Sequence, residues 1–139
     1  MLEPTSLADL YVGVWNEPDP QRRRDTIAQL WTPEGQHYVR TRKAIGYAEL
    51  EVRVRDSHEK NVAGLGYLFR RSGEAQALHD GLLFPWEMFH PDRPRIVEAR
   101  GIQFLRLAPD GRIAVDYQFI VPAPEGMTSG VMGLQHGAR

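Results

Sequence analysis

The stretch VEARGIQFLRLAPDGRIAVDYQFIV, residues 97–121, decides the fold that the sequence predicts. Two runs rich in β-forming residues, 97–108 and 112–121, flank the turn signal Pro109-Asp110-Gly111. Side chains two positions apart share one face of a strand, so each run presents two distinct faces. The stretch therefore predicts a β-hairpin of two long antiparallel strands.

Two more β-rich runs, 65–71 and 76–88, precede this hairpin along the chain. Turn signals separate the runs: Ser72-Gly73 follows the first, and Pro-Asp-Arg-Pro at 91–94 follows the second. Four long strands in succession predict an antiparallel sheet in the second half of the chain.

The first half of the chain has the periodicity of helices. A spacing of i, i+3, i+4 and i+7 predicts a first helix from its apolar residues Leu7, Leu10, Tyr11 and Val14. We expect Ser6 to cap this helix and Asp9 to lie in its first turn. Asp19 and Pro20 then supply a cap and a first-turn proline for a second helix.

The second predicted helix ends at Thr32-Pro33 and carries a buried stripe at Ile27, Leu30 and Trp31. A short strand is expected over residues 36–39. A third helix is expected to begin at Gly46 and to run to about Asn61. Its four-residue spacing places three residues on one face, namely Leu50, Val54 and His58.

The composition is that of an ordinary globular domain. The chain has 139 residues, the length of one domain, and 17 Lys and Arg against 18 Asp and Glu leave a net charge of −1. This balance argues against nucleic acid or an anionic membrane as a partner. The absence of cysteine excludes disulfides and thiolate metal sites. Without a long apolar run or a signal-peptide pattern, we expect a cytoplasmic domain with no membrane contact.

Helices first and strands later predict an α+β domain, with the three N-terminal helices packed on one face of the sheet. We expect a single domain over residues 1–139, whose core covers about 5–121. The tail, residues 122–139, contains Gly, Pro and Ser and is expected to be irregular.

The order of these elements resembles the nuclear transport factor 2-like superfamily, also called SnoaL-like. The residues that carry the resemblance are Tyr11–Asn16 followed by Asp19, Leu30–Gly35, Gly46, and Gly111–Ile113. The resemblance spans roughly residues 5–121. It implies a conical α+β barrel, in which a curved antiparallel sheet wraps a long helix and leaves a pocket at the open end. It also implies that the activity must be argued from the site, because the superfamily includes isomerases, cyclases, epoxide hydrolases, dehydratases and non-catalytic modules.

Two branches of the superfamily suggest roles for particular residues. In the ketosteroid isomerases an Asp base works beside a Tyr and a protonated Asp. Along this chain the Tyr position falls on Tyr11, the base position on Val39 and the acidic donor on Gln103. Because Val39 takes no proton, this isomerase chemistry is not expected. Polyketide cyclases are similar in using an Asp on a late strand, where this chain has Asp116 and, in an adjacent register, Gln118.

In this register, we expect a pocket of aromatic and polar side chains. The candidate catalytic residues are Asp116, as a general base, and His58. The candidate substrate-binding residues are Tyr11, Trp31, His37, Val54, Trp86, Gln103 and Gln118. Asp116 pointing to solvent and His58 as a satisfied core histidine are the alternatives. The histidines lack the spacing of a metal pair, and we expect neither a metal nor any other cofactor.

These residues suggest a domain that encloses a small apolar or aromatic molecule. If it is an enzyme, the expected chemistry is cofactor-free proton transfer next to a carbonyl, as in an isomerase, a cyclase or a dehydratase. A non-catalytic ligand-binding protein and a protein-interaction module are the alternatives.

The outer face of the predicted sheet is unusually apolar. It consists of Leu83, Ile102, Phe104, Val115, Tyr117 and Phe119. Such a face predicts a homodimer that pairs through the sheet, since monomers rarely expose a large apolar patch. Alternatively, residues 122–139 fold back over it.

Overall fold

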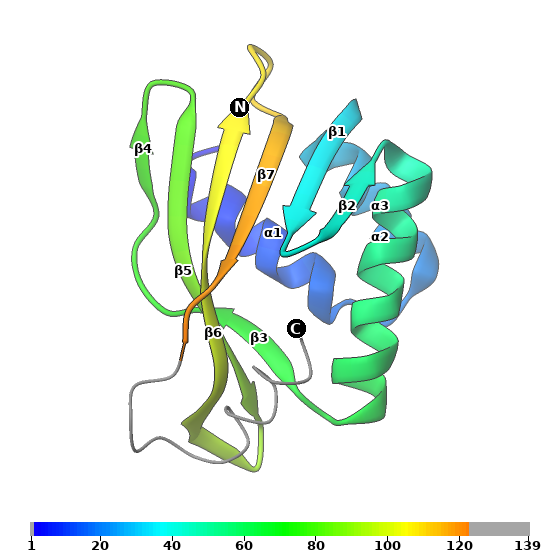
Figure 1. The fold of residues 1–139 in the computed structure, drawn as a ribbon, viewed down its shortest axis with the longest axis vertical. Coiled ribbons are helices and arrows are strands. Elements are labelled where there is room, and N and C mark those ends of the chain that lie inside the picture. The colour runs from blue at the N-terminus through cyan, green and yellow to red at the C-terminus, as the bar shows by residue number, and fades with distance from the viewer. Residues whose placement is uncertain (1, 123–139) are drawn as a thin grey trace.

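Three α-helices and a seven-stranded sheet make up residues 2–122, the part of the chain that this computed structural model describes (Figure 1). The helices are α1 (Pro4–Asn16), α2 (Pro20–Leu30) and α3 (Tyr47–Ser57), and α3 continues into the π-helical segment η1 (His58–Gly64). The strands are β1 (Trp31–Val39), β2 (Arg42–Ile45), β3 (Leu68–Arg71), β4 (Gln76–Leu78), β5 (Gly81–His90), β6 (Arg93–Leu107) and β7 (Ile113–Ile120). The predicted α+β class is confirmed.

The strand order is β2-β1-β7-β6-β5-β3, with β4 also paired to β5. The hairpin predicted from residues 97–121 is confirmed, because β6 and β7 pair antiparallel with Leu105 opposite Asp116 and Gln103 opposite Gln118. The strands predicted from residue 65 onward do pair antiparallel, but β1 joins them parallel to β7, so the sheet that was expected to be antiparallel is mixed. Strand β1 is longer than predicted, and the long chain between β1 and β7 allows the parallel pairing. The sheet is curved and unclosed, with β2 and β3 as its end strands.

Helices α1 and α2 each begin at a proline. Asp19 caps α2 as predicted, because its carboxylate accepts the backbone N–H of Arg22 at 3.0 Å and Pro20 is the first helical residue. The prediction that Ser6 caps the first helix was wrong. That helix begins three residues earlier than a Ser6 cap would place it, at Pro4, and its cap residue Glu3 makes no side-chain cap bond. Proline fits the first turn, where an N–H would have no partner, so Pro4 sets the start.

The other differences between the predicted and observed strands occur at turns and strand ends that were not predicted from the sequence. Strand β1 follows α2 directly at Trp31, and the short strand β2 was not predicted. The run 76–88 forms two strands, β4 and β5, because the chain turns between Leu78 and Gly81. His79 at this turn has a φ of 53°, a left-handed conformation uncommon for a residue with a side chain.

The core lies between the helices and the inner face of the sheet. Helix α1 runs behind strands β5, β6 and β7, and α3 lies beside β1 and β2 (Figure 1). Leu50 and Val54 of α3, Phe84 of β5 and Leu105 of β6 are all buried. Three polar side chains, His37, Gln103 and Asp116, are buried among these apolar ones. No helix in residues 2–122 has the length and apolar character that crossing a membrane requires.

Candidate functional site

A buried hydrogen-bonded cluster centres on Asp116 of β7, whose side chain is 0 % exposed. The Tyr11 hydroxyl donates to Asp116 Oδ2 at 2.7 Å, and His37 Nδ1 lies 2.7 Å from the same oxygen. The other oxygen, Oδ1, accepts from Gln103 Nε2, which also donates to the Tyr11 oxygen at 2.7 Å. Three side chains therefore converge on one carboxylate. We refer to Tyr11, His37, Gln103 and Asp116 as the Asp116 cluster.

Strand register brings the Asp116 cluster together. In the parallel pair of β1 and β7, His37 lies directly opposite Asp116. In the antiparallel pair of β6 and β7, Gln103 lies opposite Gln118. Because Gln118 is two residues from Asp116 on the same strand, the side chains of Gln103 and Asp116 share the inner face of the sheet. Helix α1 carries Tyr11, whose ring contacts Phe84 with centroids 5.6 Å apart. Four elements thus supply one side chain each.

Burial and charge determine the form of Tyr11. Its burial, and then the nearby charge of Asp116 and the hydrogen bond to it, hold the pKa of the phenol well above its usual value of 10.0. Tyr11 therefore stays a neutral donor through the physiological range, and a phenolate is disfavoured.

His37 has one free ring nitrogen. With Nδ1 donating to Asp116, Nε2 of the neutral ring carries a lone pair. Nε2 is buried and has no hydrogen-bond partner among residues 2–122. The ring lies against Trp15, with centroids 5.5 Å apart. His37 therefore adds one unpartnered ring nitrogen to the interior beside the Asp116 cluster.

A small pocket adjoins the Asp116 cluster. It is lined by Tyr11, Val12, Trp15, Arg53, Ser57, Phe69, Trp86, Gln103 and Gln118. Its cavity volume is about 30 Å³, enough for one or two water molecules. Arg53 and Gln118 are half-buried, so a larger molecule would have to displace such side chains. Tyr11 and Gln103 belong to both the pocket wall and the cluster, and they connect the two.

Known proteins share this architecture. A scan of family models and a search of curated proteins each found no match. Among solved structures, a candidate isomerase of the SnoaL-like family from Agrobacterium tumefaciens str. C58 is 24% identical. It superposes with a TM-score of 0.74 over 84% of this chain and 95% of its own.

The fold is that of the nuclear transport factor 2-like superfamily.

Two further structures with the nuclear transport factor 2-like fold resemble this chain. A nuclear transport factor 2-like protein of unknown function from Exiguobacterium sp. 255-15 is 17% identical, with a TM-score of 0.64 over 84% of this chain and 99% of its own. A candidate polyketide cyclase from Sinorhizobium meliloti is 12% identical, with a TM-score of 0.62 over the same shares. At these identities the likeness establishes the fold, and the site must be argued from its own residues.

Within this nuclear transport factor 2-like fold, the predicted site residues fall into three groups. Tyr11, Trp86, Gln103 and Gln118 line the pocket. Asp116 and His37 lie behind Tyr11 and Gln103, outside the lining. The other three lie in the core: Trp31 and Val54 are 0 % exposed, and His58 places Nδ1 3.2 Å from the carbonyl oxygen of Trp15.

Sequence reasoning missed five pocket residues, namely Val12, Trp15, Arg53, Ser57 and Phe69. Arg53 and Ser57 had a usable signal. The residues at 50, 53, 54, 57 and 58 follow the helical spacing i, i+3, i+4, i+7 and i+8, so one broad face of α3 carries both polar residues toward the core. Phe69 had no such signal, because the partner of a short strand is set by tertiary pairing.

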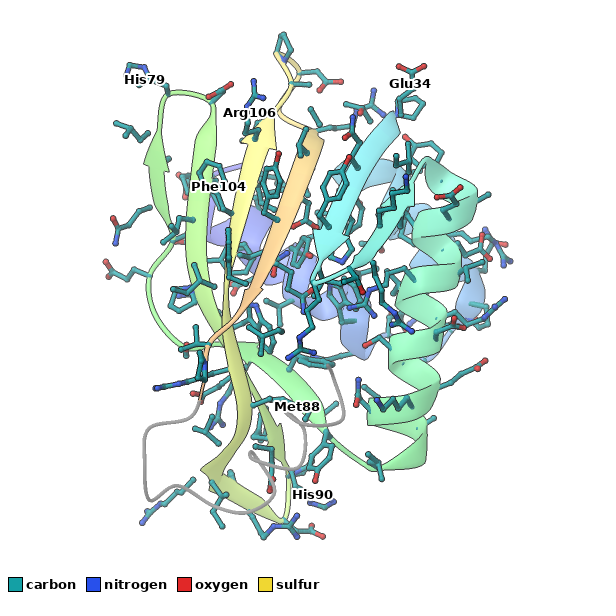
Figure 2. All side chains as sticks on the ribbon, viewed as in Figure 1. Glu34, His79, Met88, His90, Phe104 and Arg106 are labelled. Carbon is teal, nitrogen blue, oxygen red and sulfur yellow. The ribbon has the colours of Figure 1, made fainter. Side chains whose placement is uncertain are left out.

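Two further histidines of residues 2–122, His79 and His90, lie far from the Asp116 cluster. Figure 2 shows His79 at the turn between β4 and β5 and His90 at the opposite end of β5. Within residues 2–122, no group of three His, Asp or Glu side chains is placed to hold a metal ion.

Proposed function

We propose that the chain is a cofactor-free enzyme that binds a small apolar or aromatic molecule and moves a proton next to its carbonyl group. The reaction would be an isomerisation, a cyclisation or a dehydration. The observation that carries this proposal is the Asp116 cluster, which reaches the pocket through Tyr11 and Gln103. The names of two structural neighbours, a candidate isomerase and a candidate polyketide cyclase, agree with it.

The hydrogen bonds suggest a relay through Tyr11. As the Tyr11 oxygen takes a proton from the carbon next to the carbonyl, the phenol passes its own proton to Asp116 Oδ2, 2.7 Å away. The phenol stays neutral throughout, as its raised pKa requires. The Gln103 amide, whose two hydrogens go to the Tyr11 oxygen and to Asp116 Oδ1, would hold the phenol in line with the carboxylate, and His37 would hold the carboxylate in place. The reverse relay returns the proton to another carbon of the substrate.

Proton exchange into simple ketones tests this proposal. We expect the protein to accelerate the exchange of the α-protons of 2-tetralone in D2O, followed by proton NMR. Tyr11→Phe removes the relay hydroxyl and should slow the exchange by roughly 100-fold, the usual scale of general acid–base catalysis. Tyr38→Phe is the matched control, because Tyr38 stacks on Tyr117, away from the pocket, and should retain the full rate.

The proposal fails if 2-tetralone, 2-indanone and cyclohexane-1,3-dione all exchange at the rate of buffer alone. It also fails if Tyr11→Phe exchanges as fast as the unmodified chain.

One observation favours a second candidate, a ligand-binding protein without turnover. Asp116 is fully buried and already accepts three hydrogen bonds from protein groups. Such a carboxylate also serves to fix β1, β6, β7 and α1 to one another. Binding of 2-tetralone without accelerated exchange would support this candidate.

We also propose that two copies pair through the outer face of the sheet. Phe119 is 57 % exposed and Tyr117 37 % exposed, and the Tyr117 ring stacks on both Phe104 and Tyr38. Figure 2 shows Phe104 on β6, in front of the sheet, whereas α1 runs behind it. A second copy presents the same apolar face, so two-fold pairing would remove both from water. The alternative cover, residues 123–139, lies outside the described residues.

Substituting Phe119 tests this pairing. Light scattering at tens of micromolar should give a dimer mass, since about 1,600 Å² is an ordinary interface area. Phe119→Glu should give a monomer, because it places a charge in the centre of the interface. Val52→Glu is the control: Val52 is an exposed apolar residue of α3 and its replacement should leave the dimer intact. A monomer mass for the unmodified chain contradicts the proposal.

A further inference from the structure

Arg53 of α3 contributes a guanidinium group to the pocket wall. Its Cζ lies 5.0 Å from the centroid of the Trp15 ring, which also lines the pocket. Arg53 Nε is buried and has no hydrogen-bond partner among residues 2–122, and no carboxylate of these residues forms an ion pair with it. Charged groups taken out of water are normally paired, and the buried Nε of this half-buried side chain has no partner within residues 2–122.

The surroundings of Arg53 make its charge costly. Burial lowers the pKa of the guanidinium, and the neighbouring Arg42 of β2 adds like-charge repulsion, while Tyr11, Asp116 and Asp56 act in the opposite direction. Asp116 does not serve as the partner, because its oxygens accept from Tyr11, His37 and Gln103. The protein therefore keeps a cation at the pocket without providing its counter-charge from the described residues.

The rest of the wall is rich in hydrogen-bond donors. Trp86 buries an indole N–H that has no acceptor among residues 2–122. The Ser57 oxygen, one turn along α3 from Arg53, accepts from Asn61 at 3.3 Å, which leaves its hydroxyl hydrogen free to donate. Phe69 and Trp86 add an aromatic corner, with ring centroids 5.9 Å apart. The cavity of about 30 Å³ must widen to admit a larger molecule, and its wall then favours one with acceptor oxygens and a flat apolar body.

We propose that the ligand of this pocket is a small aromatic or similarly flat carboxylic acid, whose carboxylate pairs with Arg53. The planar guanidinium fork matches a carboxylate, and the pairing supplies the missing counter-charge. The apolar body lies against Trp86 and Phe69. This inference rests on the proposed small-molecule pocket and adds the charge of the molecule that the pocket takes.

Benzoate and benzamide form a matched pair of probes, since they have the same shape and differ in charge. NMR titration at pH 7 should show that benzoate binds at least ten-fold more tightly than benzamide. Arg53→Gln should remove this preference by weakening benzoate alone, and Arg53→Lys should retain part of it. Arg55→Gln is the matched control: Arg55, two residues along α3, is exposed and paired with Asp56, so both affinities should stay unchanged.

The outcomes separate this inference from the proposal on which it rests. If both probes bind equally, or if Arg53→Gln leaves the preference intact, the inference is overturned while the pocket remains. If neither probe binds, the inference and the small-molecule pocket both fail. Glu125 lies outside the described residues, so Glu125→Gln is measured too. A ten-fold gain in benzoate affinity there would identify Glu125 as the partner of Arg53 and would also overturn the inference.

Discussion

Replacing Asp116 with alanine is expected to lower the free energy of unfolding by about 3–5 kcal/mol, the usual cost of breaking a buried charged cluster. The substitution leaves the Tyr11 hydroxyl, His37 Nδ1 and the Gln103 amide without their acceptor in the core. Urea denaturation followed by circular dichroism measures the change. Asp92→Ala is the control, because Asp92 is 85% exposed and its loss should cost no more than about 0.5 kcal/mol.

The milder Asp116→Asn substitution separates chemistry from stability. The amide keeps the shape of the side chain and one acceptor oxygen, so we expect a folded protein that loses roughly 1–3 kcal/mol. It takes no proton from Tyr11, so exchange into 2-tetralone should fall by roughly 100-fold. If Asp116→Asn exchanges protons at a near-native rate, Asp116 is not part of the proposed relay. If Asp116→Ala leaves the urea midpoint unchanged, the hydrogen bonds of the Asp116 cluster do not stabilise the fold.

The second large effect is expected at Gly101 of β6. A Cβ at this position would overlap the backbone carbonyl oxygen of Phe119 and the ring of Trp86. The carbonyl belongs to the paired strand β7, and Trp86, directly opposite Gly101 on β5, is 7 % exposed, so neither can yield easily. We therefore expect Gly101→Ala to cost about 3 kcal/mol or more, at the upper end for overpacking.

Gly13→Ala in α1 is the matched control for this effect. A Cβ at Gly13 would meet nothing within 4 Å. Alanine is favoured over glycine inside a helix, so this variant should gain up to about 1 kcal/mol. The same urea titrations measure both variants. A cost below 1 kcal/mol for Gly101→Ala would mean that β5, β6 and β7 have more room than their pairing indicates.

The β-hairpin from residue 97 to residue 121 was predictable because its signals are local. Alternation within each run placed Gln103 and Asp116 on one face and Phe104 and Tyr117 on the other, and burial in the structure follows that division. The cap at Asp19 was predictable for the same reason, since a cap depends on residues three positions away. Pro4 and Ser6 are both residues that favour a helix start, and the sequence alone did not decide which of them begins α1.

The contact between His37 and Asp116 was not predictable in this way. The two residues are 79 positions apart, and they meet only because β1 pairs parallel to β7 with His37 opposite Asp116. Arg53 is a similar case: its helical spacing allowed an inward position, but only the packing of α3 beside Trp15 gives it a place in the pocket.

The sequence by itself determined which residues share a strand face or a helix face, because the backbone repeats of 2 and 3.6 residues are properties of adjacent positions. The tertiary structure decided which of those faces meet. Strand order and register are set by the burial of side chains far apart in the chain, and one residue of slip would turn Asp116 from the core to solvent. The elements were therefore predictable from local patterns, whereas the Asp116 cluster and its pocket exist only once β1, β6, β7 and α1 have packed together.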